Sequence, residues 1–126
     1  MKILKTKPPR KFGVGLHGSI VITDCAKVYL DSDEQITFSD ANDYEYDIVK
    51  KNWGYYATPS LNGRLENFKL KTALIIGENT KAFVLLVHTG KEEEFFEYLK
   101  IEKLNFICWL NKEENLELIK NAFLNK

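Results

Sequence analysis

The sequence has little of what would export, anchor or cross-link a protein. Its opening, MKILKTKPPRK, is charged but lacks an apolar run of signal-peptide length. The longest apolar stretches, ALII and FVLLV, fall far short of the about 20 residues that a membrane-spanning helix needs. We therefore expect a cytoplasmic protein without a membrane anchor.

Cysteine and histidine are also scarce. We expect Cys25 and Cys108 to remain reduced thiols, because no export signal leads the chain to an oxidising compartment. The histidines, His17 and His88, form no spaced ligand set with each other or with a cysteine. The acidic clusters at 31–34 and 40–43 lack the glycine and the closing glutamate of a calcium loop and are typical of turns. We predict no metal site and no cofactor.

The sequence also has no excess of charge of either sign. Eighteen basic residues balance eighteen acidic ones, so no overall field favours a polyanion, and we expect neither nucleic acid nor a membrane surface as a partner. The charges are unevenly spread, since every charged residue in positions 1–11 is basic. This segment also contains Pro8 and Pro9 and has no periodicity, so we predict a flexible basic arm there.

The length and composition of the chain are sufficient for one folded domain. The chain has 126 residues, of which 44% are hydrophobic and 13% aromatic, as in ordinary globular proteins. We predict a single α+β domain over residues 12–126.

Short β-branched and aromatic runs separated by turn residues fill positions 12–56. They predict a β-meander of four strands with the sequences SIVIT, AKVYL, QITFS and YEYDIV. A short helix is predicted after Pro59, because Leu61, Leu65 and Phe68 fall on one helical face. Two strands, KTALII and KAFVLLV, follow as a hairpin.

Two further helices are predicted from cap signals. Thr89 with Glu92 forms a capping box for a helix that continues through Leu99, and the strand FICWL comes next. Asn111 with Glu114 repeats the signal for a final helix, whose apolar stripe is Leu116, Ile119 and Phe123.

The order of elements from Tyr55 to Leu110 is strand, helix, strand, strand, helix, strand. This order is typical of the split βαβ pattern of ferredoxin-like domains, so we predict a mixed or antiparallel sheet with two or three helices that continues the N-terminal meander. A partly closed barrel formed by the meander, with the helices outside it, is the alternative.

The motif GVGLHG has the glycine spacing of a dinucleotide-binding loop. That motif works only between a strand and a helix whose N-terminus holds the pyrophosphate, and here a second strand follows. We interpret Gly13, Gly15 and Gly18 as part of a β-turn.

The richest segment for binding is residues 53–65, WGYYATPSLNGRL. Aromatic faces can stack on a sugar or a base, and an arginine can hold a phosphate or a carboxylate. Our candidate ligand-binding residues are Trp53, Tyr55, Tyr56, Asn62 and Arg64. The structural alternative is that Trp53 and one tyrosine fill the core, that Ser60 caps the helix, and that Arg64 pairs with a surface acid.

Most of the chain resembles small uncharacterised bacterial proteins associated with surface-glycan biosynthesis loci. The resemblance is carried by YEYDIVKKNWGYYATPSLNGRL, KTALI, LLVHTGKEEEFFEYL and ICWL. It implies a cytoplasmic accessory role in polysaccharide or sugar-nucleotide metabolism. It implies no activity and no catalytic residue.

Three functional hypotheses follow, and the first is a non-enzymatic binding or accessory module that uses the five candidate residues. The second is a protein-interaction unit, in particular a homodimer, in which KAFVLLV or FICWL forms an open sheet edge. The third is a small enzyme that uses His17, Cys25 or Asp47, for which the sequence supplies no partner at a definable spacing. We favour the first and expect no catalysis.

Overall fold

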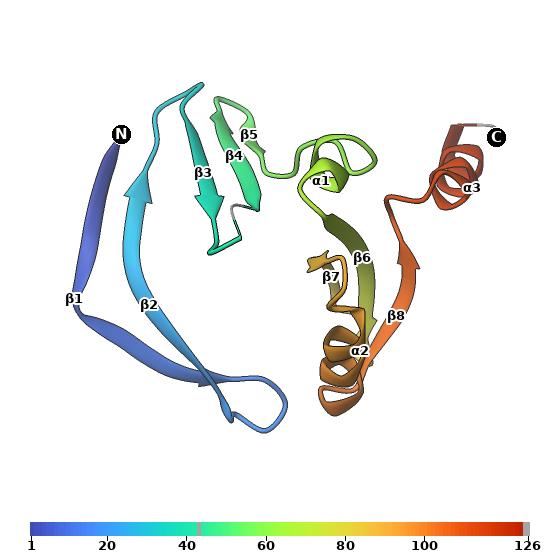
Figure 1. Cartoon of the computed structure of the whole chain (residues 1–126), viewed down its shortest axis with the longest axis horizontal. Helices are drawn as coiled ribbons and strands as arrows, with labels where there is room; N and C mark the ends of the chain where they lie inside the picture. The colour runs from blue at the N-terminus through green and yellow to red at the C-terminus, as the bar shows by residue number, and fades with distance from the viewer. Residues whose placement is uncertain (43, 125–126) are drawn as a thin grey trace. The chain divides into compact units, whose positions relative to one another are not determined.

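The structure is a computed structural model that describes residues 1–42 and 44–124 (Figure 1). Over these residues the protein is α+β, as the sequence predicts. The described residues form eight strands and three helices, and the strands form three antiparallel sheets in place of the one predicted sheet. No helix in this part of the chain has the length and apolar character needed to cross a membrane.

The chain divides into two compact units that are each discontinuous in sequence. The hairpin unit consists of Met1–Phe38 and Asp47–Ala57, and the helical unit consists of Ser39–Tyr46 and Thr58–Lys126. Whether residues 12–126 fold as a single domain stays a prediction, because the division into units does not test it. Each unit is described by itself below.

A long two-stranded sheet forms the larger part of the hairpin unit. Strand β1 (Lys2–Val14) pairs antiparallel with β2 (Ile20–Tyr29). The prediction of a flexible arm over residues 1–11 is therefore wrong, and the Met1 ammonium also lies 3.1 Å from Glu34 Oε1. The register shifts between Lys5 and Arg10, where two prolines supply no N–H to the ladder.

The turn between β1 and β2 contains the three glycines of GVGLHG. Gly15 and Gly18 have φ of 88° and 64°, and the Gly18 N–H donates to Gly15 O at 3.2 Å. A Cβ on Gly13 would lie 2.4 Å from Gly18 O, so close backbone approach requires glycine there. The β-turn interpretation of this motif is confirmed.

The predicted meander differs from the structure in two respects. Its strands are divided between two sheets, the β1-β2 sheet and a three-stranded one, and two of the predicted strands are one. SIVIT and AKVYL form one continuous strand, β2, although the sequence predicts two strands with a turn between them. Asp24 is accommodated within the ladder because its carboxylate pairs across the strands with Arg10 at 3.4 Å. The remaining strands are β3 (Gln35–Ser39), β4 (Glu45–Lys51) and β5 (Gly54–Tyr56), in the sheet order β3-β4-β5.

In the helical unit, a three-stranded sheet is packed against a helix. Its order is β7-β6-β8, from β6 (Leu70–Gly77), β7 (Ala82–His88) and β8 (Leu104–Trp109), and both pairings are antiparallel. Helix α2 (Glu92–Ile101) contributes Leu99 to a core with Ala73, Ile75 and Val87. The other two helices are α1 (Arg64–Asn67) and α3 (Glu113–Leu124).

The ferredoxin-like arrangement is not confirmed. In that arrangement the first and last strands of the repeat would pair, whereas here β5 pairs with β4 and β8 pairs with β6. The local sequence patterns predict these strands and helices correctly, but they do not determine which distant strands pair, because that pairing depends on tertiary packing.

Both predicted helix caps are wrong. Helix α2 begins at Glu92, and its N-cap, Lys91, makes no side-chain cap hydrogen bond. Helix α3 begins at Glu113, two residues after Asn111. Asn111 instead accepts a hydrogen bond from the Thr72 N–H at 3.2 Å and donates to Glu66 Oε1 at 3.1 Å, so its side chain joins three elements.

Candidate ligand-binding hairpin

Three of the five candidate residues lie together on the β4–β5 hairpin. Its ladder pairs Val49 with Tyr56, Lys50 with Tyr55 and Lys51 with Gly54, so Trp53 lies in the tight turn. The exposed fractions are 68% for Trp53, 59% for Tyr55 and 50% for Tyr56. The alternative in which Trp53 and a tyrosine fill the core is therefore wrong, and the hairpin presents three aromatic rings to solvent.

A lysine that sequence reasoning missed lies against the Tyr55 ring. The Lys50 ammonium is 5.0 Å from the centroid of the Tyr55 ring and donates to Gly54 O at 3.3 Å. These contacts hold a positive charge at the base of the turn, beside an exposed ring. Once the two-residue turn is placed, Lys50 and Tyr55 follow as cross-strand neighbours, but the sequence alone does not place that turn.

The neighbouring Lys51 is already neutralised. Its ammonium forms an ion pair with Asp33, which precedes β3. Lys50 also donates its backbone N–H to Glu34 O, at 2.9 Å, and accepts at its carbonyl from the Asp33 N–H, at 2.7 Å. The backbone beneath the aromatic turn is thus fixed by hydrogen bonds on its β3 side.

The other two candidate residues belong to the helical unit. Asn62 is exposed, and Arg64 opens α1. The Arg64 guanidinium is 3.5 Å from Glu45 Oε2 and 4.8 Å from the centroid of the Phe68 ring. The predicted pairing of Arg64 with a surface acid is confirmed. Ser60 is not the N-cap of α1, which is Gly63, but its Oγ accepts a hydrogen bond from the Arg64 N–H at 2.9 Å. A single site of all five residues stays a prediction, because they are divided between the two units.

His88 is the centre of a second cluster, within the helical unit. It ends the edge strand β7, and its Nε2 lies 3.2 Å from Asp40 Oδ2. The Tyr44 ring packs 5.1 Å from the imidazole, and Asp40 Oδ1 accepts from the backbone N–H groups of Asn42 and Tyr44. The turn that follows β3 is thereby fastened to β7; residue 43 of that turn lies outside the described residues.

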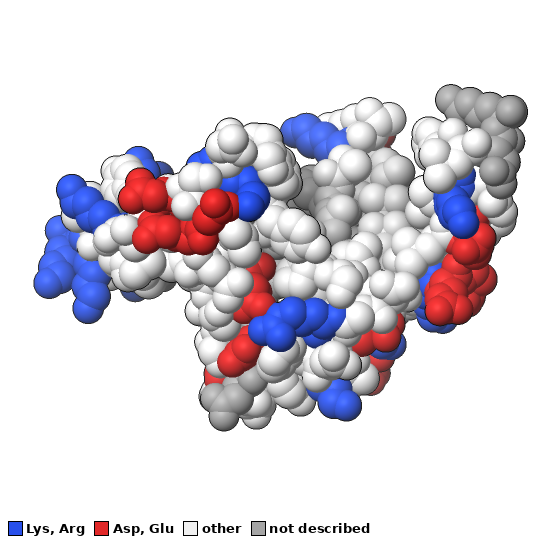
Figure 2. All heavy atoms as spheres, turned by 90° about the horizontal axis from the view of Figure 1, so that it is seen from above, with Lys and Arg blue, Asp and Glu red and all other residues white. Residues whose placement is uncertain are grey.

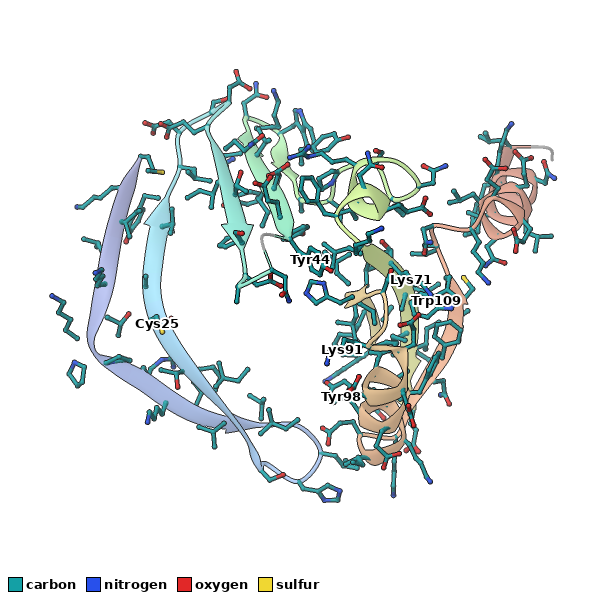
Figure 3. All side chains as sticks on the ribbon, viewed as in Figure 1. Cys25, Tyr44, Lys71, Lys91, Tyr98 and Trp109 are labelled. Atoms are coloured by element: carbon teal, nitrogen blue, oxygen red, sulfur yellow. The ribbon has the colours of Figure 1, made fainter. Side chains whose placement is uncertain are left out.

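A third cluster joins β6, α2 and β8. The Lys71 ammonium lies 2.7 Å from Glu92 Oε2 and 5.0 Å from the centroid of the Trp109 ring, and Figure 3 shows Lys71 beside Trp109. The hydrogen bond from Lys71 lowers the pKa of the Glu92 carboxyl below its ordinary value, with further help from backbone N–H groups. Each member is already engaged by the others, so we assign this cluster a structural role.

The residues considered for catalysis do not form a constellation. His17 lies in the turn after β1, and Cys25 lies four residues beyond Val21 along β2, which is ~14 Å at ~3.4 Å per residue. Asp47 is buried on β4 and accepts a hydrogen bond from Thr37 at 2.8 Å. Within residues 1–42 and 44–124 no group of three or more His, Cys, Asp and Glu side chains could hold a metal ion.

Comparison with known proteins yields no relative. No protein-family model, no curated protein and no solved structure matches the chain. The assignment of a site therefore depends on the geometry described above.

Proposed function

We propose that the chain is a non-enzymatic binding module whose β4–β5 hairpin takes a sugar or a nucleotide-sugar. The observation that carries the proposal is the exposed Tyr55 ring beside the Lys50 ammonium, with Trp53 exposed in the adjacent turn. Tyr56 is also exposed, but it follows Tyr55 in β5 and so points to the opposite face of the hairpin. Isolated exposed apolar residues are normal, but an exposed indole in a turn and an exposed phenol ring two residues later, beside an ammonium, favour a binding surface. A resemblance to proteins of surface-glycan loci favours the same ligand class and a cytoplasmic accessory role in bacterial polysaccharide metabolism.

The chemistry of the hairpin suits a ligand with an apolar face and an anionic group. An indole or phenol ring can pack against the C–H face of a sugar, while a nearby ammonium can attract a phosphate. Lys50 supplies that ammonium, held at 5.0 Å from the Tyr55 ring. A nucleotide-sugar carries both groups and is the ligand we favour over a neutral sugar.

Binding to a panel of neutral sugars, nucleotides and nucleotide-sugars, measured by isothermal titration calorimetry, tests the proposal. The Trp53→Ala variant should weaken binding by about 1–2 kcal/mol, or about 5- to 30-fold, because it removes the most exposed ring. Tyr98→Ala is the matched control, since Tyr98 is a 40% exposed aromatic residue on α2. Equal affinity of wild type and Trp53→Ala, or no binding across the panel, would refute the proposal.

A protein-interaction unit is the second candidate. The observation in its favour is that β7 and β8, the strands KAFVLLV and FICWL, are the two edges of their sheet. An uncovered strand edge can pair with a strand of another chain. Light scattering at increasing concentration tests this candidate, and a constant monomer mass would exclude the homodimer.

A further inference from the structure

The β1–β2 hairpin lacks what a stable sheet needs. It is a sheet of two strands only, and its large apolar side chains are exposed along its whole length, among them Ile3 at 52%, Val21 at 67% and Ile22 at 42%. A two-stranded hairpin is at best marginally stable in water, and three or more strands with an apolar face, or a packed helix, are needed. The strands β1 and β2 therefore need a third strand or a covering layer to form a stable sheet.

The register shows that one face of this hairpin is apolar. Directly paired residues point to the same face of a sheet, and the pairs Ile3–Val28, Phe12–Ile22 and Val14–Ile20 occupy alternate rungs that share one face. The ion pair of Arg10 with Asp24 crosses this face between them. The opposite face is mixed, because it carries Lys2, Lys11 and Lys27 together with Leu4, Val21 and Tyr29.

The two open edges of the hairpin differ in charge. Figure 2 shows basic side chains gathered at the left, where Figure 1 places β1. The basic residues of β1 are Lys2, Lys5, Lys7, Arg10 and Lys11. Lysines and prolines on an edge strand are a common defence against pairing, and β1 has both. Strand β2 has a single lysine, a single aspartate and no proline, so its edge is open to another strand.

We propose that the edge of β2 pairs antiparallel with β2 of a second copy, about a two-fold axis at Cys25. The result is a four-stranded sheet in the order β1-β2-β2-β1, which supplies the strands that the hairpin lacks. The proposal concerns assembly and is independent of ligand binding at the β4–β5 hairpin.

Symmetry limits the possible registers. In a two-fold antiparallel pair the residues that face each other must point to the same side of the sheet, so their numbers add to an even total. A total of 48 would set Asp24 directly against its own copy, which like-charge repulsion disfavours. A total of 50 sets Cys25 against Cys25 and leaves the longest overlap without directly opposed like charges.

The cross-strand pairs in this register are mutually compatible. On the apolar face Ile22 meets Val28, and on the other face Val21 meets Tyr29 and Thr23 meets Lys27. The β-branched and aromatic pairs are of the kind that stabilises sheets, and the single lysine faces a hydroxyl. The strand is thus self-complementary, which favours a second copy over an unrelated chain.

The edges of the β7-β6-β8 sheet have less need of a partner than the edge of β2. That sheet already has α2 packed on one face, with Leu99, Ile75 and Val87 buried at 3%, 0% and 5% exposure. It therefore meets the condition for independent stability that β1 and β2 fail.

The mass of the full chain in solution, with two matched variants at the axis, tests the proposal. Wild type and Cys25→Ser should be dimers at tens of micromolar, whereas Cys25→Lys should be monomeric, with a dimer dissociation constant raised about tenfold or more, since it sets two ammonium groups opposite each other. A monomeric wild type, or a Cys25→Lys variant that stays as dimeric as wild type, would overturn the proposal.

Cross-linking keeps the test decisive if Cys25→Lys fails to fold. Both cysteines are free thiols, and Cys25 is exposed. Facing residues of an antiparallel pair have Cα atoms ~4.5–5.5 Å apart, within the range that a disulfide spans. In the Cys108→Ser variant, copper-phenanthroline as the oxidant should remove two electrons and two protons from the paired thiols and give a covalent dimer on a non-reducing gel. The absence of that dimer would contradict the register at Cys25.

Discussion

Replacing Asn111 distinguishes a helix cap from a bridge between elements. The sequence pattern makes Asn111 the cap of the last helix, whereas its side chain accepts from the Thr72 N–H at 3.2 Å and donates to Glu66 Oε1 at 3.1 Å. Asn111 is 9% exposed and Thr72 is fully buried, so water cannot replace the lost partner of that N–H. Removing the side chain leaves a buried donor unsatisfied, at a cost of about 1–3 kcal/mol.

The substitution Asn111→Asp separates the two roles more sharply than Asn111→Ala. Aspartate is as good a helix cap as asparagine, so a cap role predicts nearly unchanged stability. In the bridge, the new carboxylate would face Glu66 with no proton to donate. We expect Asn111→Asp to lower the free energy of unfolding by about 1–3 kcal/mol at pH 7, and Asn111→Ala by about 2 kcal/mol.

The assay is urea unfolding followed by the fluorescence of Trp109, which lies at the end of β8 in the same unit. A Trp53→Phe background removes the other indole. Adding Glu66→Gln to Asn111→Asp should recover most of the loss, because the charge opposite the aspartate is gone. An Asn111→Asp variant as stable as its parent at pH 7 would refute the bridge.

Three further predictions concern the core, an ion pair and the β1–β2 turn. In the same assay Leu99→Ala should lower the free energy of unfolding by about 3 kcal/mol, because Leu99 is 3% exposed. Ile101→Ala, at a 51% exposed position, should lower it by under about 1 kcal/mol. Equal losses in the two variants would contradict the described core. The pKa of Glu92 is lowered, so its ion pair with Lys71 stabilises the fold above the ordinary carboxyl pKa, and this stabilisation is lost as the pH falls through the lowered pKa. The melting temperature of Glu92→Gln should therefore approach that of wild type in acid. A difference in melting temperature that widens in acid would contradict the role of the ion pair. Gly13→Ala should speed amide hydrogen exchange throughout β2, since the new methyl would lie 2.4 Å from Gly18 O. His17→Ala, in the same turn, should leave that exchange unchanged. Equal protection of β2 in both variants would refute the close approach of Gly13 to Gly18.

Much of the helical unit is predictable from local sequence, because its elements carry strong periodicity. The hairpin of β6 and β7 follows from two apolar runs joined by Gly77–Thr80, and α2 and α3 follow from their apolar stripes. The element boundaries are less predictable. Cap patterns at Thr89 and Asn111 suit a helix start, but the side chain of Asn111 serves other elements instead.

The hairpin unit shows where local reasoning fails. Residues 1–11 have no alternation and two prolines, yet they form a strand because β2 offers a ladder and the prolines fall where the register shifts. Nothing local reveals that pairing, which depends on residues more than ten positions away. In the candidate site, the aromatic residues were found by composition, whereas Lys50 was missed because its closeness to Tyr55 depends on the position of the turn.

Amide NMR of the labelled protein, during titration with nucleotide-sugars and neutral sugars, tests the central claim most directly. Each backbone N–H of the β4–β5 hairpin reports separately, so the spectrum shows where a ligand binds as well as whether it binds. The account predicts saturable shifts confined to residues 50–56, larger for nucleotide-sugars than for neutral sugars. Shifts that cluster elsewhere in the chain, or spectra unchanged at saturating ligand, would contradict the assignment of this hairpin as the binding site.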